Sequence, residues 1–157
     1  MATQKMQICL WFNNQAEEAA KFYTSVIKDS SIGKISRYGK DGFEFHKMPE
    51  GTALMVSFKI NNLDMLALNG GPMFKFTEAI SMVVNCETQE EIDYVWGAFT
   101  EEGEEGQCGW LKDKYGISWQ IVPTILSTLM SNPEKAPRVM KAFLQMKKFD
   151  IKKLTEA

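Results

Sequence analysis

The sequence predicts an α+β protein made of two βαβββ modules that form a cleft, followed by a C-terminal helical extension. Two observations predict it. A strand-like run followed by an amphipathic helical run occurs twice, and each pair is followed by further strand-like segments. One helix covers only one face of a four-stranded sheet, so each half needs the other to complete a core. We therefore expect modules at residues 1–72 and 73–123 and an extension at 124–157, all in one structural unit.

The first half begins with a strand at residues 6–12 and a helical run at 15–28. Apolar residues recur along this run at the spacing of one buried helix face, namely Ala16, Ala19, Ala20, Tyr23, Val26 and Ile27. Asn14 and Glu17 have the spacing of a capping box, which predicts the start of the helix. Strands at 31–38, 52–60 and 63–69 follow, and Gly70-Gly71-Pro72 predicts a break before the second half.

The second half repeats this order, with a strand at 79–84 and a helical run at 88–99. Its apolar face consists of Ile92, Val95, Trp96 and Phe99, and Thr88 and Glu91 form a second capping-box pattern. A short strand near 103–106 and strands at 107–112 and 117–122 complete the module. The extension contains an apolar segment at 125–130, a break at Asn132-Pro133, and helices at 135–148 and 150–157.

The amino-acid composition excludes several classes of protein. Hydrophobic residues make up 45% of the 157 residues and charged residues 24%, which is typical of a globular domain rather than a disordered one. Eighteen basic against twenty acidic residues give a net charge of −2, so we expect no nucleic-acid partner. No apolar run is long enough to span a membrane, and we expect no secretory signal. Three separated cysteines favour reduced thiols and a cytoplasmic location.

Common catalytic and cofactor motifs are missing from the sequence. There is no C-x-x-C or H-x-x-x-H pair, the only histidine is His46, and neither a dinucleotide nor a phosphate-loop motif occurs. Cys108, between glycines and close to Lys112, is a weak candidate for a catalytic thiol. Its alternative is a packing role, because the glutamates just upstream disfavour a thiolate.

Polar and aromatic residues on the strands suggest a binding face. Strand alternation places Ser118, Gln120 and Val122 on one face and Trp119 and Ile121 on the other. An amide within an apolar strand must be satisfied internally or face a wet cleft, and we favour the cleft for Gln120.

Four segments resemble the PhnB-like branch of the vicinal-oxygen-chelate superfamily: LWFNNQAEEAAKFY, LNGGPMFKFTEAISMVVNCETQEEID, EEGQCGWLKDKYGISWQIVP and RVMKAFLQMKKFDI. That superfamily includes glyoxalase I, bleomycin-resistance proteins and extradiol dioxygenases, and the branch is also labelled demethylubiquinone methyltransferase-like. The resemblance implies a glyoxalase-like fold of two βαβββ modules with a cleft, and a homodimer.

The resemblance also implies where a divalent metal would bind in metal-using relatives. Their ligand positions map to Gln7 (or Ile8), Met65, Ala79 and Gln120, none of which is a histidine or a carboxylate. Such a set would hold a divalent ion poorly, so we expect no metal. We also expect no other cofactor, because the chain lacks the glycine-rich strand-to-helix turn on which methyl transfer from S-adenosylmethionine usually rests.

Three functions follow as hypotheses. The first is a metal-independent protein that holds a small molecule in the cleft, with ligand contacts from Trp11, Asn69, Phe76, Trp110 and Gln120. The second is an enzyme of metal-dependent lyase, dioxygenase or methyltransferase type. The third is a dimeric module with a closed cleft. The aromatic residues serve equally well as core filling.

Overall fold

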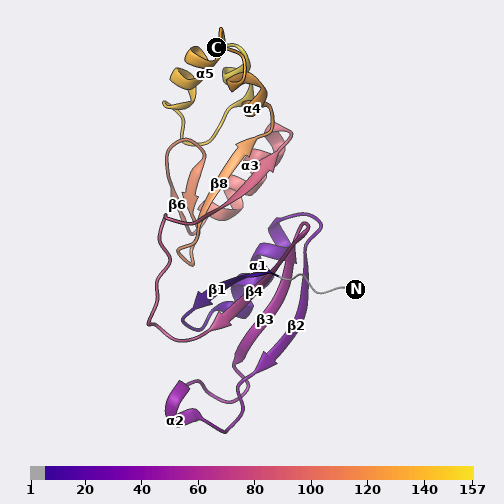
Figure 1. Cartoon of the computed structure of the whole chain (residues 1–157), viewed down its shortest axis with the longest axis vertical. Helices are drawn as coiled ribbons and strands as arrows, with labels where there is room; N and C mark the ends of the chain where they lie inside the picture. Colours follow the sequence, from indigo (N-terminus) through magenta and orange to yellow (C-terminus); the bar gives the residue numbers. More distant parts are fainter. Residues whose placement is uncertain (1–5) are drawn as a thin grey trace. The chain divides into compact units, whose positions relative to one another are not determined.

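The computed structural model describes residues 6–157, which divide into two compact units (Figure 1). The first unit ends at Lys75, and the second comprises Phe76–Ala157. Each contains a four-stranded sheet and a helix that packs against it, so the predicted α+β class with two βαβββ modules is confirmed.

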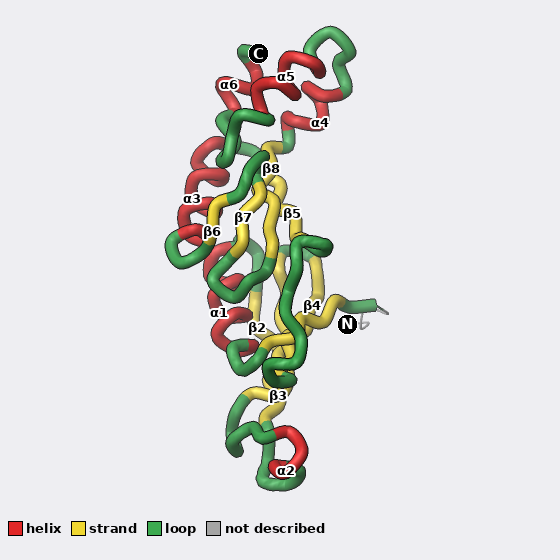
Figure 2. The backbone as a smooth tube through the Cα atoms, turned by 90° about the vertical axis from the view of Figure 1, so that its left-hand side faces the viewer, coloured by secondary structure: helices red, strands yellow, loops and turns green. Residues whose placement is uncertain are grey.

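The first module has its strands in the order β1-β4-β3-β2, with β1 parallel to β4 and the other neighbours antiparallel. Its elements are β1 (Ile8–Phe12), α1 (Ala16–Val26), β2 (Ser31–Arg37), α2 (Phe43–His46), β3 (Ala53–Ile60) and β4 (Leu63–Asn69). Strand β4 has the bounds that the sequence predicts, whereas the short helix α2 was not predicted. Helix α1 covers one face of the sheet, with Ala16, Ala19, Ala20, Tyr23 and Val26 buried as expected (Figure 2).

The second module repeats this topology with the strand order β5-β8-β7-β6. Its elements are β5 (Ser81–Cys86), α3 (Gln89–Thr100), β6 (Glu104–Glu105), β7 (Trp110–Lys112) and β8 (Ser118–Pro123). Helix α3 buries its predicted face against the sheet, and the Phe99 ring stacks on the Trp119 ring at 4.5 Å between centroids. The strand predicted at 79–84 is found two residues later, as β5.

The two module helices begin in different ways. The second capping box forms, because the Thr88 side chain accepts a hydrogen bond from the Glu91 amide at 3.2 Å. The first does not form: residue 15 caps α1 without a side-chain bond, and the Ala16 amide donates to Asn69 Oδ1 at 2.8 Å instead. Glu17 binds Arg37 and Lys21 rather than the helix start. A long-range partner has therefore replaced the local one.

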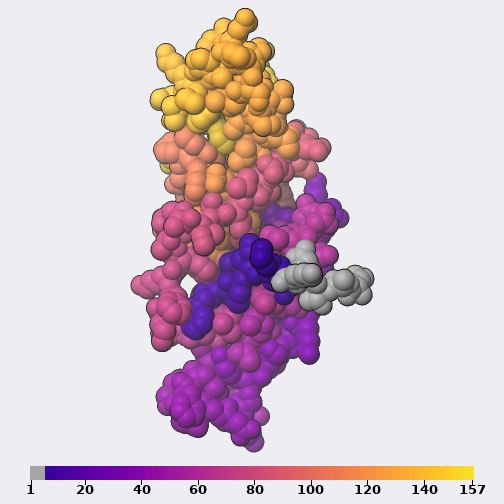
Figure 3. Space-filling view, in the orientation of Figure 1, coloured from indigo at the N-terminus to yellow at the C-terminus, as the bar shows by residue number. Residues whose placement is uncertain are grey.

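The C-terminal segment contains α4 (Ile125–Met130), α5 (Ala136–Phe143) and α6 (Ile151–Thr155), coloured orange to yellow in Figure 3. The helix expected at 135–148 ends early, at Phe143. Beyond it, the carbonyls of Met146 and Lys147 accept hydrogen bonds from the Cys108 and Gly109 amides, both at 2.7 Å. Docking against the second module thus ends the helix. Among the described residues, no helix is long and apolar enough to cross a membrane.

Candidate functional site

Each sheet has a face opposite its helix, which we call the helix-free face. In the second module, strand register places Val83, Gln120 and Trp110 in one row across this face, and Ser81, Ser118 and Lys112 in the next. Alternation sends Trp119 and Ile121 to the α3 side, where both are buried. The predicted division of strand β8 into a polar and an apolar face is therefore correct.

A cavity of about 150 Å³ lies beside β6 and β7, where this helix-free face ends. Trp110, Lys112 and Ser118 line it together with Glu78 and Glu104. The Lys112 ammonium forms an ion pair with the Glu78 carboxylate. That hydrogen-bonded pair lowers the pKa of Glu78 and raises the pKa of Lys112, so both groups are held in their charged forms at neutral pH.

Ser118 is the unusual member of this group. It is 2% exposed, and its Oγ is a buried side-chain oxygen with no hydrogen-bond partner among residues 6–157. Leaving a buried hydroxyl unpaired costs about 1–3 kcal/mol, so such groups are rare in native structures. Gln120, on the same face, does have a hydrogen-bond partner, because its Nε2 donates to Ser81 Oγ at 2.9 Å.

The four tryptophans also differ in whether their indole N–H has a hydrogen-bond partner. The indole nitrogens of Trp11, Trp96 and Trp119 donate to Gly71 O, a Glu105 carboxylate oxygen and an Asp113 carboxylate oxygen, respectively. The half-buried Trp110 makes no indole hydrogen bond to any residue that the structure describes. The helix-free face of the second module therefore presents an unused hydroxyl, an unused indole N–H and an ammonium group beside one cavity.

Two predicted ligand-binding residues of the first module have structural contacts. The Trp11 ring packs edge-on against Phe74 at 4.9 Å, and its indole is bound to Gly71 at 2.8 Å. Asn69 is 1% exposed; its Oδ1 accepts from the Ala16 amide, and its Nδ2 donates to Ala53 O at 2.9 Å. Asn69 thereby joins the start of α1 to strand β3.

Two further predicted site residues lie outside the cavity lining. Phe76 is half-buried in the segment that precedes β5. Cys108 has a left-handed backbone (φ 56°), and its thiol donates to the Phe143 carbonyl at 3.7 Å. At that position the C-terminal segment docks, through the hydrogen bonds of the Cys108 and Gly109 amides to Met146 O and Lys147 O. Of the predicted residues, Trp110 and Gln120 thus come together in one row.

The residues at the expected metal-ligand positions do not fit a divalent ion. Met65 is fully buried on the α1 side, and the residue next to it, Leu66, lies on the helix-free face. Gln7 and Ala79 lie just outside β1 and β5, which leaves Gln120 as an isolated amide. Among residues 6–157, no three His, Cys, Asp or Glu side chains gather into a metal-binding group.

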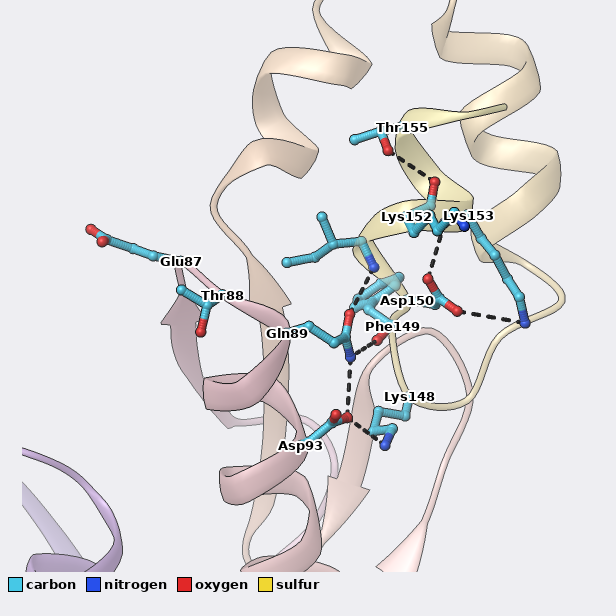
Figure 4. Close-up of a pocket in the computed structure, with 11 residues that line it drawn as sticks. Glu87, Thr88, Gln89, Asp93, Lys148, Phe149, Asp150, Lys152, Lys153 and Thr155 are labelled. Atoms are coloured by element: carbon cyan, nitrogen blue, oxygen red, sulfur yellow. Dashed lines mark hydrogen bonds and ion pairs between the residues drawn. The ribbon is translucent and has the colours of Figure 1, made fainter.

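A second hollow, of about 770 Å³, lies between the start of α3 and the C-terminal segment (Figure 4). Its polar groups bind one another: Gln89 donates to Asp93 and to Phe149 O, both at 3.1 Å, and accepts from the Ile151 amide at 2.9 Å. Lys148 forms an ion pair with Asp93, which, together with the Gln89 hydrogen bond, lowers the pKa of Asp93. These contacts hold the C-terminal segment in place, and they leave few groups to bind a ligand.

Sequence reasoning missed Ser118, Lys112 and Glu78 as site residues. Strand alternation already placed Ser118 on the same face as Gln120, so the sequence could have predicted Ser118 as a candidate as well. Lys112 and Glu78 depend on the pairing of β7 with β8 and on an ion pair across 34 positions of the chain, for which no local pattern exists.

Comparisons with known proteins agree with this architecture. Residues 4–122 match the family described as 3-demethylubiquinone-9 3-methyltransferase. A Bacillus cereus PhnB protein, carrying the same methyltransferase name, is 37% identical; the match covers 77% of this chain and 100% of that one, with a TM-score of 0.70. No curated protein matches the chain.

More distant structures share the fold alone. A Pseudomonas aeruginosa protein is 14% identical over 77% of this chain and 98% of its own, with a TM-score of 0.61. The fosfomycin resistance protein FosX from Listeria monocytogenes, in a structure with Mn(II) and sulfate, is 11% identical over 88% and 98%, with a TM-score of 0.52. The chain therefore belongs to the 3-demethylubiquinone-9 3-methyltransferase family, which it shares with the Bacillus cereus PhnB protein.

Proposed function

We propose that this protein binds a small molecule with an aromatic or other flat apolar part on the helix-free face of the second module. Trp110 supplies the apolar surface, and Gln120, Ser118 and Lys112 supply the polar contacts. One observation carries the proposal: the buried Ser118 hydroxyl and the Trp110 indole have no partner in the described part of the chain, beside a cavity that could hold one. Binding sites commonly combine apolar walls with a few placed polar groups.

Binding in this proposal needs no divalent metal. Neither the amide of Gln120 nor the thioether of Met65 is a good ligand for a hard cation. The residues themselves can orient a ligand by stacking and hydrogen bonding, and Lys112 can stabilise negative charge on it. Methyl transfer is the second candidate, and the family description is the observation that favours it.

The proposal includes a cytoplasmic homodimer as the working form, on the resemblance to the PhnB-like branch. Three free cysteines are consistent with a reducing compartment. Sedimentation at micromolar concentration tests the dimer, and a single species with the mass of one chain would contradict it.

A fragment screen tests the binding function. A set of small aromatic carboxylates, amides and amines is added to the protein, and binding is followed by saturation-transfer NMR on the ligand signals. The same set is then run on Trp110→Leu and on the control Tyr94→Leu, which removes an exposed aromatic ring from α3.

We expect several fragments to bind, and their affinity to fall about ten-fold or more in Trp110→Leu, because a stacked aromatic contact contributes roughly this much. Tyr94→Leu should bind as the natural protein does. Equal binding by both variants, or no binding by the natural protein, would contradict the proposal. Transfer of a labelled methyl group from S-adenosylmethionine to an added phenol would favour the second candidate.

A further inference from the structure

We propose that the cavity beside β6 and β7, where the helix-free face of the second module ends, receives a carboxylate group of the ligand, and that Glu78 occupies the place of that carboxylate until the ligand displaces it. This inference rests on the proposed function. It names the chemical class of the ligand's polar end and gives Glu78 the role of an internal competitor.

The strand register sets the geometry. Lys112 on β7 pairs directly with Ser118 on β8, and Ser118 pairs directly with Ser81 on β5. Glu78 precedes β5 by three positions and forms an ion pair with Lys112. The ion pair therefore connects β7 to the segment that leads into β5, and Ser118 on β8 lies between β7 and β5. A carboxylate already sits on the cation of this site, in the same chain.

The hydrogen-bonding groups around the cavity match an oxygen acceptor. Lys112 has three N–H donors, and the Ser118 hydroxyl and the Trp110 indole can each donate one. A carboxylate accepts several hydrogen bonds at once and binds charged donors more strongly than a neutral group does. A ligand carboxylate would thus gain the Ser118 hydroxyl, which Glu78 leaves unpaired.

Displacing Glu78 from Lys112 should cost little free energy. Its side chain is 65% exposed and that of Lys112 33%, so water screens their attraction and can solvate Glu78 when it leaves. The cavity volume is about 150 Å³. That space suits a carboxylate with the first atoms of the group that carries it.

Two other carboxylates line the cavity, and they define the rival hypothesis. Glu105 binds the Trp96 indole at 3.1 Å and Lys147 at 3.2 Å, and these contacts lower its pKa. Glu104 pairs with Lys112 across β6 and β7 and adds to the negative potential around that cation. In the rival hypothesis the ligand carries a cationic group that this negative potential attracts. Loss of the Glu78 charge would then weaken binding of the ligand.

Three isosteric probes separate these ideas: benzoate, benzamide and benzamidinium. Each is titrated into the 15N-labelled protein while the indole resonance of Trp110 is followed. The titrations are repeated on Glu78→Gln and on Glu102→Gln, a control that makes the same charge change in an ion pair of similar exposure with Lys114. Lys112→Met and Ser118→Ala complete the set.

We expect benzoate to bind at least about five-fold more tightly than benzamide, and Glu78→Gln to tighten benzoate by about three- to ten-fold because its competitor is gone. Glu102→Gln should leave the affinity unchanged. Lys112→Met should remove the preference for benzoate over benzamide, and Ser118→Ala should weaken benzoate.

Tightest binding of benzamidinium, or benzoate affinity that does not rise in Glu78→Gln, would overturn the inference. If all three probes leave the Trp110 resonance unmoved while other aromatic fragments still require Trp110, the carboxylate assignment fails and the proposed function stands. If Trp110→Leu binds every fragment normally, the proposed function itself fails, and this inference fails with it.

Discussion

The two modules share one topology but differ in how their helix-free faces are satisfied. In the first, the Trp11 indole is bound to Gly71, and the Ser57 hydroxyl binds both the amide and the carbonyl of Lys34, at 2.7 and 3.1 Å. In the second, the Trp110 indole and the buried Ser118 hydroxyl have no such partners among the described residues. The same topology thus pairs these groups in one copy and leaves two hydrogen-bonding groups unpaired in the other.

The modules also differ in how they anchor their helices, and the largest expected effect tests this difference. Asn69→Ala removes the amide that caps α1 and ties it to β3, so it should leave two buried backbone groups unpaired and lower the free energy of unfolding by roughly 3 kcal/mol. Thr88→Ala removes only a local cap of α3 and should cost about 1 kcal/mol.

Urea denaturation measures both variants, with Asn62→Ala in the exposed turn between β3 and β4 as the control. If Asn69→Ala proved no more destabilising than Thr88→Ala, long-range capping would not be the anchor of the first module.

A serine pair sharpens the comparison of the two faces. Ser57→Ala should destabilise the protein by about 1 kcal/mol, because Lys34 loses a bonded hydroxyl. Ser118→Ala should instead be neutral, or stabilise by up to about 1 kcal/mol, because it removes a buried hydroxyl without a partner. Thermal unfolding in the absence of added ligand distinguishes the signs. A loss of stability in Ser118→Ala equal to that in Ser57→Ala would show that the hydroxyl is satisfied in solution.

The smallest effect concerns charge in the first module. Hydrogen bonds from Arg37 and then from Lys21 lower the pKa of Glu17 to about 2, from an ordinary value near 4.5. Because the folded pKa is the lower one, the pair stabilises the fold fully above about pH 4.5, and this stability is lost as the pH falls towards 2. Both side chains are partly exposed, so the effect at neutral pH should stay below about 1 kcal/mol.

Arg37→Met should therefore reduce the fall in unfolding free energy between pH 4.5 and 2, measured by urea denaturation along a pH series. Arg138→Met, at an exposed position on α5, serves as the control. An unchanged pH dependence in Arg37→Met would mean that the ion pair is not formed in solution.

Local patterns in the sequence predicted much of the fold. The apolar faces of α1 and α3, the Thr88 cap and the bounds of β4 follow from spacing and are found as expected. The cap of α1 and the early end of α5 depend on Asn69 and on the Cys108 and Gly109 amides, which lie far away in the chain. No periodicity encodes such partners.

The candidate site likewise has features that local sequence patterns predict and features that they do not. Alternation alone put Gln120 and Ser118 on one face. The pairing of Trp110 with Gln120, and the ion pair of Lys112 with Glu78, require the order of the strands. Asn69 was predicted as a ligand contact, but an amide at the end of a strand can cap a helix as well as bind a ligand.

The most direct test of the account follows two indole resonances in one experiment. The 1H–15N signals of Trp11 and Trp110 are recorded while small aromatic carboxylates, amides and amines are added in turn. We expect saturable movement of the Trp110 signal and no movement of the Trp11 signal, because among the described residues the Trp11 indole is bonded to Gly71 O whereas the Trp110 indole and the Ser118 hydroxyl have no partner. Movement of Trp11 with Trp110 unchanged, or no movement of either signal with any compound, would contradict it.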